Sequence, residues 1–237
     1  VEPNMIPMDE SKKVLVITPH PDDAESGAGG TIAKWSNQGA DIALVVCTNG
    51  DKGTSDRNID SKKIATLRKA EQSDSAEALG LSKVVFLDHP DQGLEDNAEF
   101  RAQLVREIRI HRPDVVLTID PERGWIRHRD HYVTGRVTLD AIFPYARDYL
   151  AYPDMIDEGL EPHKVLDVLL WGSDNPDTFI DIDETFEIKM DALYCHKSQM
   201  SQSRDVGSER SRKRFAEYGP RVNAILAEPF KRLRIRG

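Results

Sequence analysis

Four short apolar runs, separated by stretches with helical periodicity, constrain the fold of this chain more than any other feature. They cover residues 14–18 (VLVIT), 41–48 (DIALVVCT), 84–87 (VVFL) and 115–119 (VVLTI). Each run is continuous rather than alternating, as expected of a strand that is buried on both faces. Helices are expected between them, over 25–38, over 61–79 and up to Pro113. This alternation with short links predicts a parallel sheet that is covered by helices on both faces.

The second half of the chain is less regular. We expect a helix at about 130–143 and an irregular segment at 144–163. Two late strands at 165–172 and 178–182 and a last helix at 183–199 should follow. No repeat, low-complexity tract or linker divides the sequence. We therefore predict one α/β domain over residues 1–237, Rossmann-like, with three α/β/α layers and a mainly parallel sheet. Residues 1–12 are interpreted as a short leader and 204–237 as a basic C-terminal tail.

The charge of the chain limits its partners. The formal net charge of −9, from 32 Lys/Arg and 41 Asp/Glu, argues against broad binding to nucleic acid or to an anionic membrane. The segment 204–237 differs, because it holds ten basic and four acidic residues. A basic tail can bind an anionic ligand, but it is more typical of a solvated surface or a subunit contact.

Cysteine content and hydropathy indicate the compartment. Cys47 and Cys195 are isolated and form no CxxC pair, so we expect two reduced thiols in a cytoplasmic protein. No apolar stretch approaches the about 18 residues that a membrane-spanning helix needs. No membrane span is therefore expected.

The segment TPHPDDAESGAGG, at 18–30, follows the first strand and allows two kinds of site. Its glycines could cradle a phosphate, but the dinucleotide fingerprint G-x-G-x-x-G would need glycine at Ile32. Gly27, Gly29 and Gly30 also come about ten residues after the strand, inside the expected helix. We interpret them as small residues that allow close packing of the helix on the sheet, and a nucleotide site becomes the weaker alternative.

A metal site is the stronger alternative. His20 and Asp23 are three residues apart at the expected helix start, so one turn can direct both at one point. Imidazole nitrogen and carboxylate oxygen together suit zinc, and also Fe(II) or Mn(II). His128, Asp130 and His131 follow the fourth strand, and strands one and four can be neighbours in a parallel sheet. The two clusters are predicted to converge; the alternative is that each histidine is an ordinary capping or surface residue.

These motifs, in this order, make the chain similar to the PIG-L/LmbE-like zinc deacetylases, which remove acetyl groups from N-acetylglucosamine-containing substrates. The resemblance covers nearly the whole chain and rests on PHPDD (19–23), TNGDKGT (48–54), RKAEQSDSAEALG (68–80), HRDH (128–131) and HKSQ (196–199). The HPDD and H-x-D-H motifs are specific, and the others are weak alone. Two departures are visible: Ala24 stands before Glu25 where many members have Glu directly after the aspartates, and Arg129 stands where many have Pro. Neither removes an expected ligand or base. Because related proteins often assemble, the resemblance also implies a homo-oligomer.

The resemblance implies that His20, Asp23 and His131 are the metal ligands. Two neutral imidazoles and one carboxylate leave a zinc ion positively charged and able to activate water. Asp22 is then the general base that acts on this water. The alternative for Asp22 is a carboxylate that is favoured by the dipole at a helix N-terminus.

The resemblance also implies roles for residues that do not bind the metal. His128 is expected to stabilise the tetrahedral oxyanion or to protonate the leaving amine, with Asp130 orienting it and raising its pKa; the alternative for Asp130 is a helix N-cap. Arg68 is expected to bind sugar hydroxyls, the alternative being a surface ion pair with Glu71. His196 either edges the pocket or has a structural role.

The expected protein is thus a zinc-dependent N-deacetylase. Its substrate would be an N-acetylglucosamine-type amino sugar or its conjugate, attacked by water activated at the metal. Two alternatives remain: a nucleotide-binding Rossmann-like module, and a metal-holding protein without deacetylase activity. The intact Asp22 and His128 argue against the inactive protein. The residues do not select one amino sugar among those that the family accepts.

Overall fold

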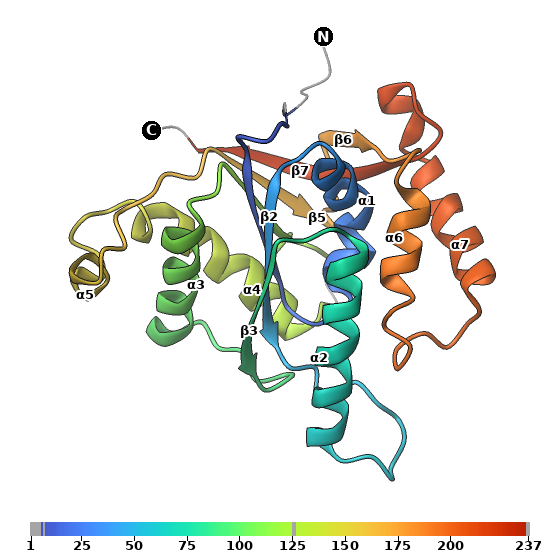
Figure 1. The fold of residues 1–237 in the computed structure, drawn as a ribbon, viewed down its shortest axis with the longest axis horizontal. Helices are drawn as coiled ribbons and strands as arrows, with labels where there is room; N and C mark the ends of the chain where they lie inside the picture. The colour runs from blue at the N-terminus through green and yellow to red at the C-terminus, as the bar shows by residue number, and fades with distance from the viewer. Residues whose placement is uncertain (1–5, 7, 125–126, 236–237) are drawn as a thin grey trace.

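The computed structural model describes residues 6, 8–124 and 127–235. Within these residues the centre is a seven-stranded sheet of order β3-β2-β1-β4-β5-β7-β6 (Figure 1). The strands are β1 (Lys13–Thr18), β2 (Asp41–Thr48), β3 (Lys83–His89), β4 (Val115–Ile119), β5 (Asp167–Trp171), β6 (Thr178–Asp181) and β7 (Ala227–Arg234). The first five are parallel to one another, and β7 lies antiparallel between β5 and β6. The mainly parallel sheet is confirmed.

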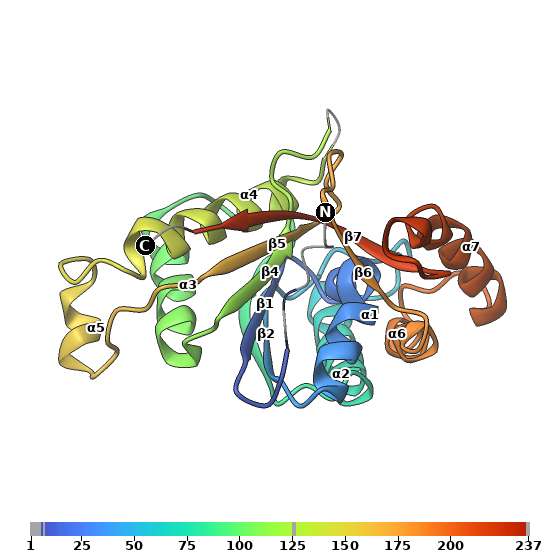
Figure 2. The same ribbon diagram turned by 90° about the horizontal axis from the view of Figure 1, so that it is seen from above.

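Helices cover both faces of this sheet (Figure 2). They are α1 (Asp23–Asn37), α2 (Ser61–Ala78), α3 (Ala98–His111), α4 (Arg129–Asp140), α5 (Pro153–Asp157), α6 (Phe186–Leu193) and α7 (Arg204–Ala216). Leu15 and Ile17 of β1 pack with α3 and α4, whereas Val14 and Val16 pack with α1 on the other side. Because both faces of β1 are buried, its apolar run has no polar alternation. The predicted three-layer α/β/α architecture is confirmed.

The glycines of α1 serve packing. A Cβ atom on Gly27 would lie 2.3 Å from Cδ1 of Trp171, and one on Gly30 would lie 2.7 Å from Cγ2 of Ile182. Any larger side chain would therefore push α1 away from β5 and from the segment before α6. The interpretation of these glycines as packing residues is confirmed, and the structure offers no phosphate cradle at these positions.

The last part of the chain differs from the expected basic tail. Residues 204–237 contain α7 and β7, and β7 pairs with β5 on one side and β6 on the other. The excess of basic residues led to the interpretation of this segment as a tail. The last expected helix is also shorter, because α6 ends at Leu193 and turns follow.

The expected leader is partly in contact with the fold. Ile6 and Met8 pack against the core beneath α1, while residues 1–5 and 7 lie outside the described part of the chain. Among the described helices, none combines the length and the apolar character that crossing a bilayer requires.

A buried ion pair attaches β7 and α6 to α1. Lys189 Nζ donates to Glu228 Oε1 at 2.7 Å and to the backbone carbonyl of Glu25 at 2.8 Å. Glu228 in turn accepts from the backbone N–H groups of Gly30 (3.0 Å) and Thr31 (2.8 Å). Neither charged side chain has any exposed surface. A pair of this kind is tolerated only while both partners are present, because either charge alone would be buried without compensation.

Replacing Lys189 by methionine should therefore destabilise the protein strongly. We expect the free energy of unfolding, measured by urea denaturation at pH 7, to fall by about 3–5 kcal/mol. The matched control is Lys213→Met on α7, which removes an exposed pair with Glu209 and should cost about 0–1 kcal/mol. Equal losses for the two variants would contradict the assignment of the Lys189–Glu228 pair as a central contact.

Candidate active site

The carboxyl ends of the central strands bring the two predicted clusters together. Strands β1 and β4 are direct neighbours, with Ile17 opposite Thr118. The loop after β1 therefore meets the start of α4 at one edge of the sheet, which is where open α/β sheets bind ligands. The ring centroid of His20 lies 4.7 Å from that of His128 and 5.2 Å from that of His131. The expectation that strands one and four are neighbours is confirmed.

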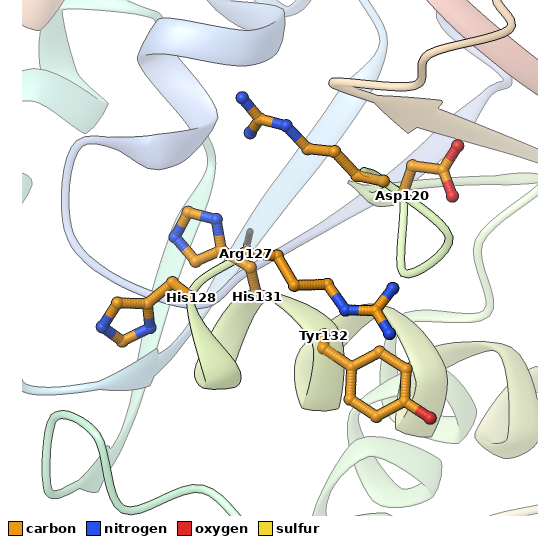
Figure 3. Close-up of a pocket in the computed structure, with 6 residues that line it drawn as sticks. Asp120, Arg127, His128, His131 and Tyr132 are labelled. Atoms are coloured by element: carbon orange, nitrogen blue, oxygen red, sulfur yellow. The ribbon is translucent and has the colours of Figure 1, made fainter. Parts of the chain in front are cut away.

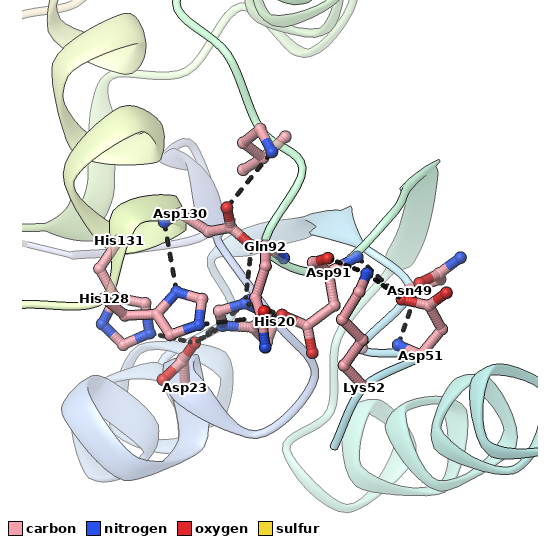
Figure 4. Close-up of polar contacts among 12 residues, drawn as sticks. His20, Asp23, Asn49, Asp51, Lys52, Asp91, Gln92, His128, Asp130 and His131 are labelled. Carbon is pink, nitrogen blue, oxygen red and sulfur yellow. Dashed lines mark hydrogen bonds and ion pairs between the residues drawn. The ribbon is translucent and has the colours of Figure 1, made fainter. Parts of the chain in front are cut away.

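Asp23 lies between two of these imidazoles. Its Oδ2 is 2.9 Å from Nδ1 of His20 and 3.1 Å from Nε2 of His131 (Figure 4). Burial alone would raise the pKa of Asp23, but the two histidines hold it well below its usual range. His128 completes a group of three imidazoles, each with a nitrogen within 4.8 Å of the others. The three expected ligands are thus in contact around one oxygen atom.

Two more carboxylates face the other side of His20. Its Nε2 lies 3.1 Å from Oδ2 of Asp130 and 3.2 Å from Oδ1 of Asp91. Asp91 belongs to the loop after β3, which enters the same edge of the sheet (Figure 4). Asp91 was not predicted as a site residue from the sequence. The signal that could have found it is its position directly after the third strand, where the other polar clusters also lie.

Asp130 contacts His128 in a different way from the one expected. Its carboxylate accepts the backbone N–H groups of Gln92 (2.6 Å) and Leu94 (3.2 Å) and faces His20. Its backbone N–H, not its side chain, reaches His128, donating to Nδ1 at 3.2 Å. His128 therefore caps α4, the position that Asp130 was expected to take under its structural alternative. Burial and the neighbouring His20 lower the pKa of His128.

The charge around His20 suits a metal cation. Burial would lower the pKa of His20, but the carboxylates of Asp130, Asp23 and Asp91 together raise it to about 11. Oδ1 of Asp91 is buried and, although close to His20, makes no hydrogen bond of acceptable geometry. The carboxylate oxygens around His20 are thus more numerous than the hydrogen-bond donors that the cluster provides for them. Nitrogen and oxygen donors of this kind fit Zn²⁺, and Fe²⁺ or Mn²⁺ as well.

Asp22, next to the ligand Asp23, adopts a strained backbone. Its φ of 91° lies in the left-handed region, which few non-glycine residues occupy. The conformation is held from α2: its N–H donates to Oε1 of Gln72 at 3.3 Å, and Arg68 Nη2 donates to its Oδ2 at 3.1 Å. Burial, followed by the charge of Asp23, raises the pKa of Asp22 to about 7.

Arg68 is enclosed by the loop after β2. Its guanidinium donates to the carbonyls of Pro21 (2.6 Å) and Gly50 (3.2 Å). A Cβ on Gly50 or on Gly53 would lie 2.4 Å from Nη1, so only glycine leaves room for this side chain. The surface ion pair with Glu71 is wrong, because both residues are buried and Glu71 accepts from Ser198 instead. The contact of Arg68 with sugar hydroxyls stays a prediction.

A second buried hydrogen-bond network, centred on Glu25, is joined to Asp22 through Gln72. Glu25 Oε1 accepts from Gln72 Nε2 at 2.6 Å and from Ser75 Oγ at 2.7 Å. His196 is fully buried with its Nε2 3.7 Å from the same oxygen. The structural alternative for His196 is therefore favoured over a place at the pocket edge. The contact between Glu25 and Gln72 was not predicted, because the two residues lie on separate helices and their spacing along the chain gives no sign of it.

The region matched by a family model contains seven predicted site residues, but not His196; the seven are His20, Asp22, Asp23, Arg68, His128, Asp130 and His131. The PIG-L family model, described as GlcNAc-PI de-N-acetylase, matches residues 15–142, more than half of the chain. The chain belongs to the PIG-L family. The resemblance that the sequence motifs indicated is confirmed.

Two deacetylases are similar to this PIG-L protein over most of its length. The diacetylchitobiose deacetylase of Thermococcus kodakarensis is 36% identical over 196 residues, covering 83% of this chain and 73% of the relative. The structure of the N,N'-diacetylchitobiose deacetylase of Pyrococcus horikoshii, complexed with its inhibitor MPG, superposes with a TM-score of 0.88 at 31% identity. That superposition covers 94% of this chain and 84% of the other.

The fold is also shared with a protein of different chemistry. GalB, the 4-carboxy-2-hydroxymuconate hydratase of Pseudomonas putida KT2440, superposes with a TM-score of 0.79 at 22% identity, covering 95% of this chain and 98% of the other. An identity this low shows the common fold alone. The activity of this PIG-L protein must therefore be argued from its site.

Metal binding should follow the contacts around Asp23. We expect His131→Ala to lose most of the divalent metal that the wild-type protein retains, measured by elemental analysis after dialysis. Asp130→Asn should weaken metal affinity by about 10–100-fold, because Asp130 orients His20 from the side opposite Asp23. The control is His163→Ala at the opposite edge of the sheet, where His163 contacts the carbonyl of Pro113. Retention of wild-type metal content by His131→Ala would exclude it as a ligand.

Proposed function

We propose that this PIG-L protein hydrolyses the N-acetyl group of an N-acetylglucosamine-type amino sugar or of its conjugate. The observation that carries the proposal is the contact of Asp23 with His20 and His131, beside the strained carboxylate of Asp22. Relatives are diacetylchitobiose deacetylases, and the matched family model is described as GlcNAc-PI de-N-acetylase.

The metal of the proposed reaction would be held by His20, Asp23 and His131. Zinc is the expected ion, and the same donors suit Fe²⁺ or Mn²⁺. When bound, such an ion supplies Lewis acidity, which polarises the amide carbonyl and makes water a better nucleophile at neutral pH. Asp130 and Asp91 contribute by fixing the orientation of the His20 ring from its other nitrogen.

Asp22 takes the proton of the attacking water. A pKa raised to about 7 by burial places this carboxylate near the operating pH, which is where a general base is most effective. Arg68 and Gln72 hold it in place from α2, so that the proton acceptor needs no reorganisation before reaction. The proton can then pass to the departing amine. Arg68, which lies against Asp22, is also proposed to contact the sugar.

His128 donates a hydrogen bond to the oxygen that becomes negative. Because Nδ1 accepts the N–H of Asp130, the neutral ring carries its proton on Nε2. The lowered pKa of His128 favours this neutral form, with burial as its main cause. The side chain is 36% exposed and lines the cavity at the site, so Nε2–H is available to a substrate. Asp130 thus acts on His128 through its backbone and sets the tautomer.

The remaining expectations concern the surroundings of the protein. Cys47 and Cys195 are both free thiols, as expected. The cytoplasmic location stays a prediction. A homo-oligomer stays a prediction.

The role of Asp22 can be separated from metal binding. Asp22→Asn should lower kcat for an N-acetylglucosaminide by about 10²–10⁴-fold, measured as release of free amine and acetate, because the base is lost. Metal content should stay near that of the wild type. Asp205→Asn, an exposed carboxylate on α7, is the control and should change neither quantity. Loss of metal from Asp22→Asn would show that ligand and base are assigned to the wrong aspartates.

The role of His128 predicts a different signature. His128→Ala removes one donor to the oxyanion and should lower kcat by about 10²–10³-fold, with little change in KM. Metal content should again be retained, since His128 is not a proposed ligand. An unchanged kcat would place His128 outside the reaction. Release of acetate from none of N-acetylglucosamine, diacetylchitobiose and N-acetylglucosaminyl-inositol by the metal-loaded wild-type protein would overturn the proposed activity on these substrates.

A further inference from the structure

Asp22 occupies the N-cap position of α1 without capping the helix. An aspartate at such a position ordinarily has an extended backbone, and its side chain accepts an N–H of the first helical turn. Asp60, before α2, follows this rule, with a φ of −85° and a bond from the N–H of Lys63 at 2.8 Å. Asp22 has a φ of 91°, and its carboxylate makes no capping hydrogen bond. The carboxylate is therefore left available to the site.

The backbone N–H of Asp22 departs from the usual pattern as well. In a capping box, a glutamate at the third helical position accepts the N–H of the N-cap residue directly. Glu25 stands at this position of α1, but its Oε1 accepts from two side chains of α2, Gln72 Nε2 at 2.6 Å and Ser75 Oγ at 2.7 Å. Oε1 of Gln72 then accepts the N–H of Asp22 at 3.3 Å. The box is thus completed through a residue of another helix.

Glu25 fixes which end of the Gln72 amide faces Asp22. A carboxylate only accepts hydrogen bonds, so it selects the Nε2 end of the amide, and the oxygen end must face the N–H of Asp22. The reversed amide would place oxygen against the carboxylate and N–H against N–H. The side chains of Glu25 and Gln72 are fully buried, so solvent water does not compete for these bonds.

The segment 196–199 supports Glu25 from another element. His196 is fully buried, with its Nε2 3.7 Å from Oε1 of Glu25. Burial alone would lower the pKa of His196, but the carboxylates around it, Glu25 first, raise it and favour the imidazolium. The backbone N–H and the hydroxyl of Ser198 both donate to Glu71, which attaches the segment to α2. The HKSQ motif, which has no part in the reaction proposed above, thereby supplies a countercharge for Glu25.

We propose that Glu25 is a positioning residue: through Gln72 it keeps Asp22 from capping α1, and so leaves the carboxylate of Asp22 free to act as the base. The inference rests on the proposed function, in which the base is assigned. Without the Gln72 contact, Asp22 would turn to an extended backbone, as at Asp60, and its carboxylate would bind N–H groups of the first turn of α1. The reaction would then lose its proton acceptor.

The supporting residues act on the reaction only through Asp22. The cavity at the site has a volume of about 180 Å³ and includes His128 and His131 in its lining (Figure 3). Neither Glu25 nor Gln72 is among its lining residues, and both are fully buried. A change at either residue should therefore lower kcat and leave KM unaltered.

The crystal structure of metal-loaded Gln72→Met tests the proposal without turnover. Methionine fills similar space and removes the amide. We expect the φ of Asp22 to become negative and its carboxylate to accept the N–H of Ala24 or Glu25. The control is Gln38→Met, an exposed residue at the other end of α1, which should keep Asp22 in the left-handed conformation. A left-handed Asp22 in Gln72→Met would overturn the inference.

Kinetics test whether the contact serves the base. Gln72→Met should lower kcat by about 10–100-fold, because the base is withdrawn, while KM and metal content stay near those of the wild type. In the Asp22→Asn background the same substitution should lower kcat by less than about twofold, since residues that act as a unit are not additive. Equal fold losses in the two backgrounds would give Gln72 a general structural role and contradict the proposal.

Exchanging the two residues gives a second test, which decides alone if Gln72→Met does not fold. Gln72→Glu places two carboxylates in contact and should lower kcat. Adding Glu25→Gln restores an acceptor opposite the N–H of Asp22 and a donor to hold it, so the double variant should recover kcat by about tenfold over Gln72→Glu. A double variant no more active than Gln72→Glu would overturn the proposed positioning.

The structural and kinetic results separate this inference from the proposed function. Capping of α1 by Asp22 in Gln72→Met, in a protein whose wild type releases no acetate, would leave the positioning standing and refute the deacetylase. A left-handed Asp22 in a fully active Gln72→Met would leave the deacetylase standing and refute the positioning.

Discussion

The parallel pairing of β1 with β4 decides where chemistry can occur in this molecule. It joins the loop that carries His20, Asp22 and Asp23 to the helix that carries His128 and His131, although more than a hundred residues separate them. Neither cluster could hold a metal ion alone, because each offers too few correctly placed donors. The pairing is set by buried apolar side chains on both faces of β1, so the hydrophobic core determines the geometry of the site.

Around that junction, residues outside the two clusters hold the side chains of the site in place. Arg68 and Gln72 hold the strained Asp22, and glycines at 50 and 53 leave room for the arginine. Backbone amides after β3 hold Asp130 against His20. The motifs TNGDKGT and RKAEQSDSAEALG are weak sequence signals, but they supply the residues that surround the stronger HPDD motif. The same fold serves a hydratase, so the fold alone does not select hydrolysis.

Much of this arrangement could be predicted from the sequence, for physical reasons. Continuous apolar runs indicate buried parallel strands, and polar clusters after two of them indicate a site at one edge of the sheet. The strand β7 could not be predicted in the same way, because its buried Glu228 is acceptable only beside Lys189, which lies on another element. The contact of Asp130 with His20 was missed for a similar reason. Spacing along the chain shows which residues share a helical turn, but not which ring a carboxylate faces.

The Lys189–Glu228 pair has a consequence for the order in which the molecule assembles. The amides in the middle of α1 are bound by a side chain that comes about two hundred residues later in synthesis. During translation α1 can form early, but this contact cannot form until β7 has been synthesised. The helix that carries the candidate ligand Asp23 is therefore fixed in part by one of the last strands to be made.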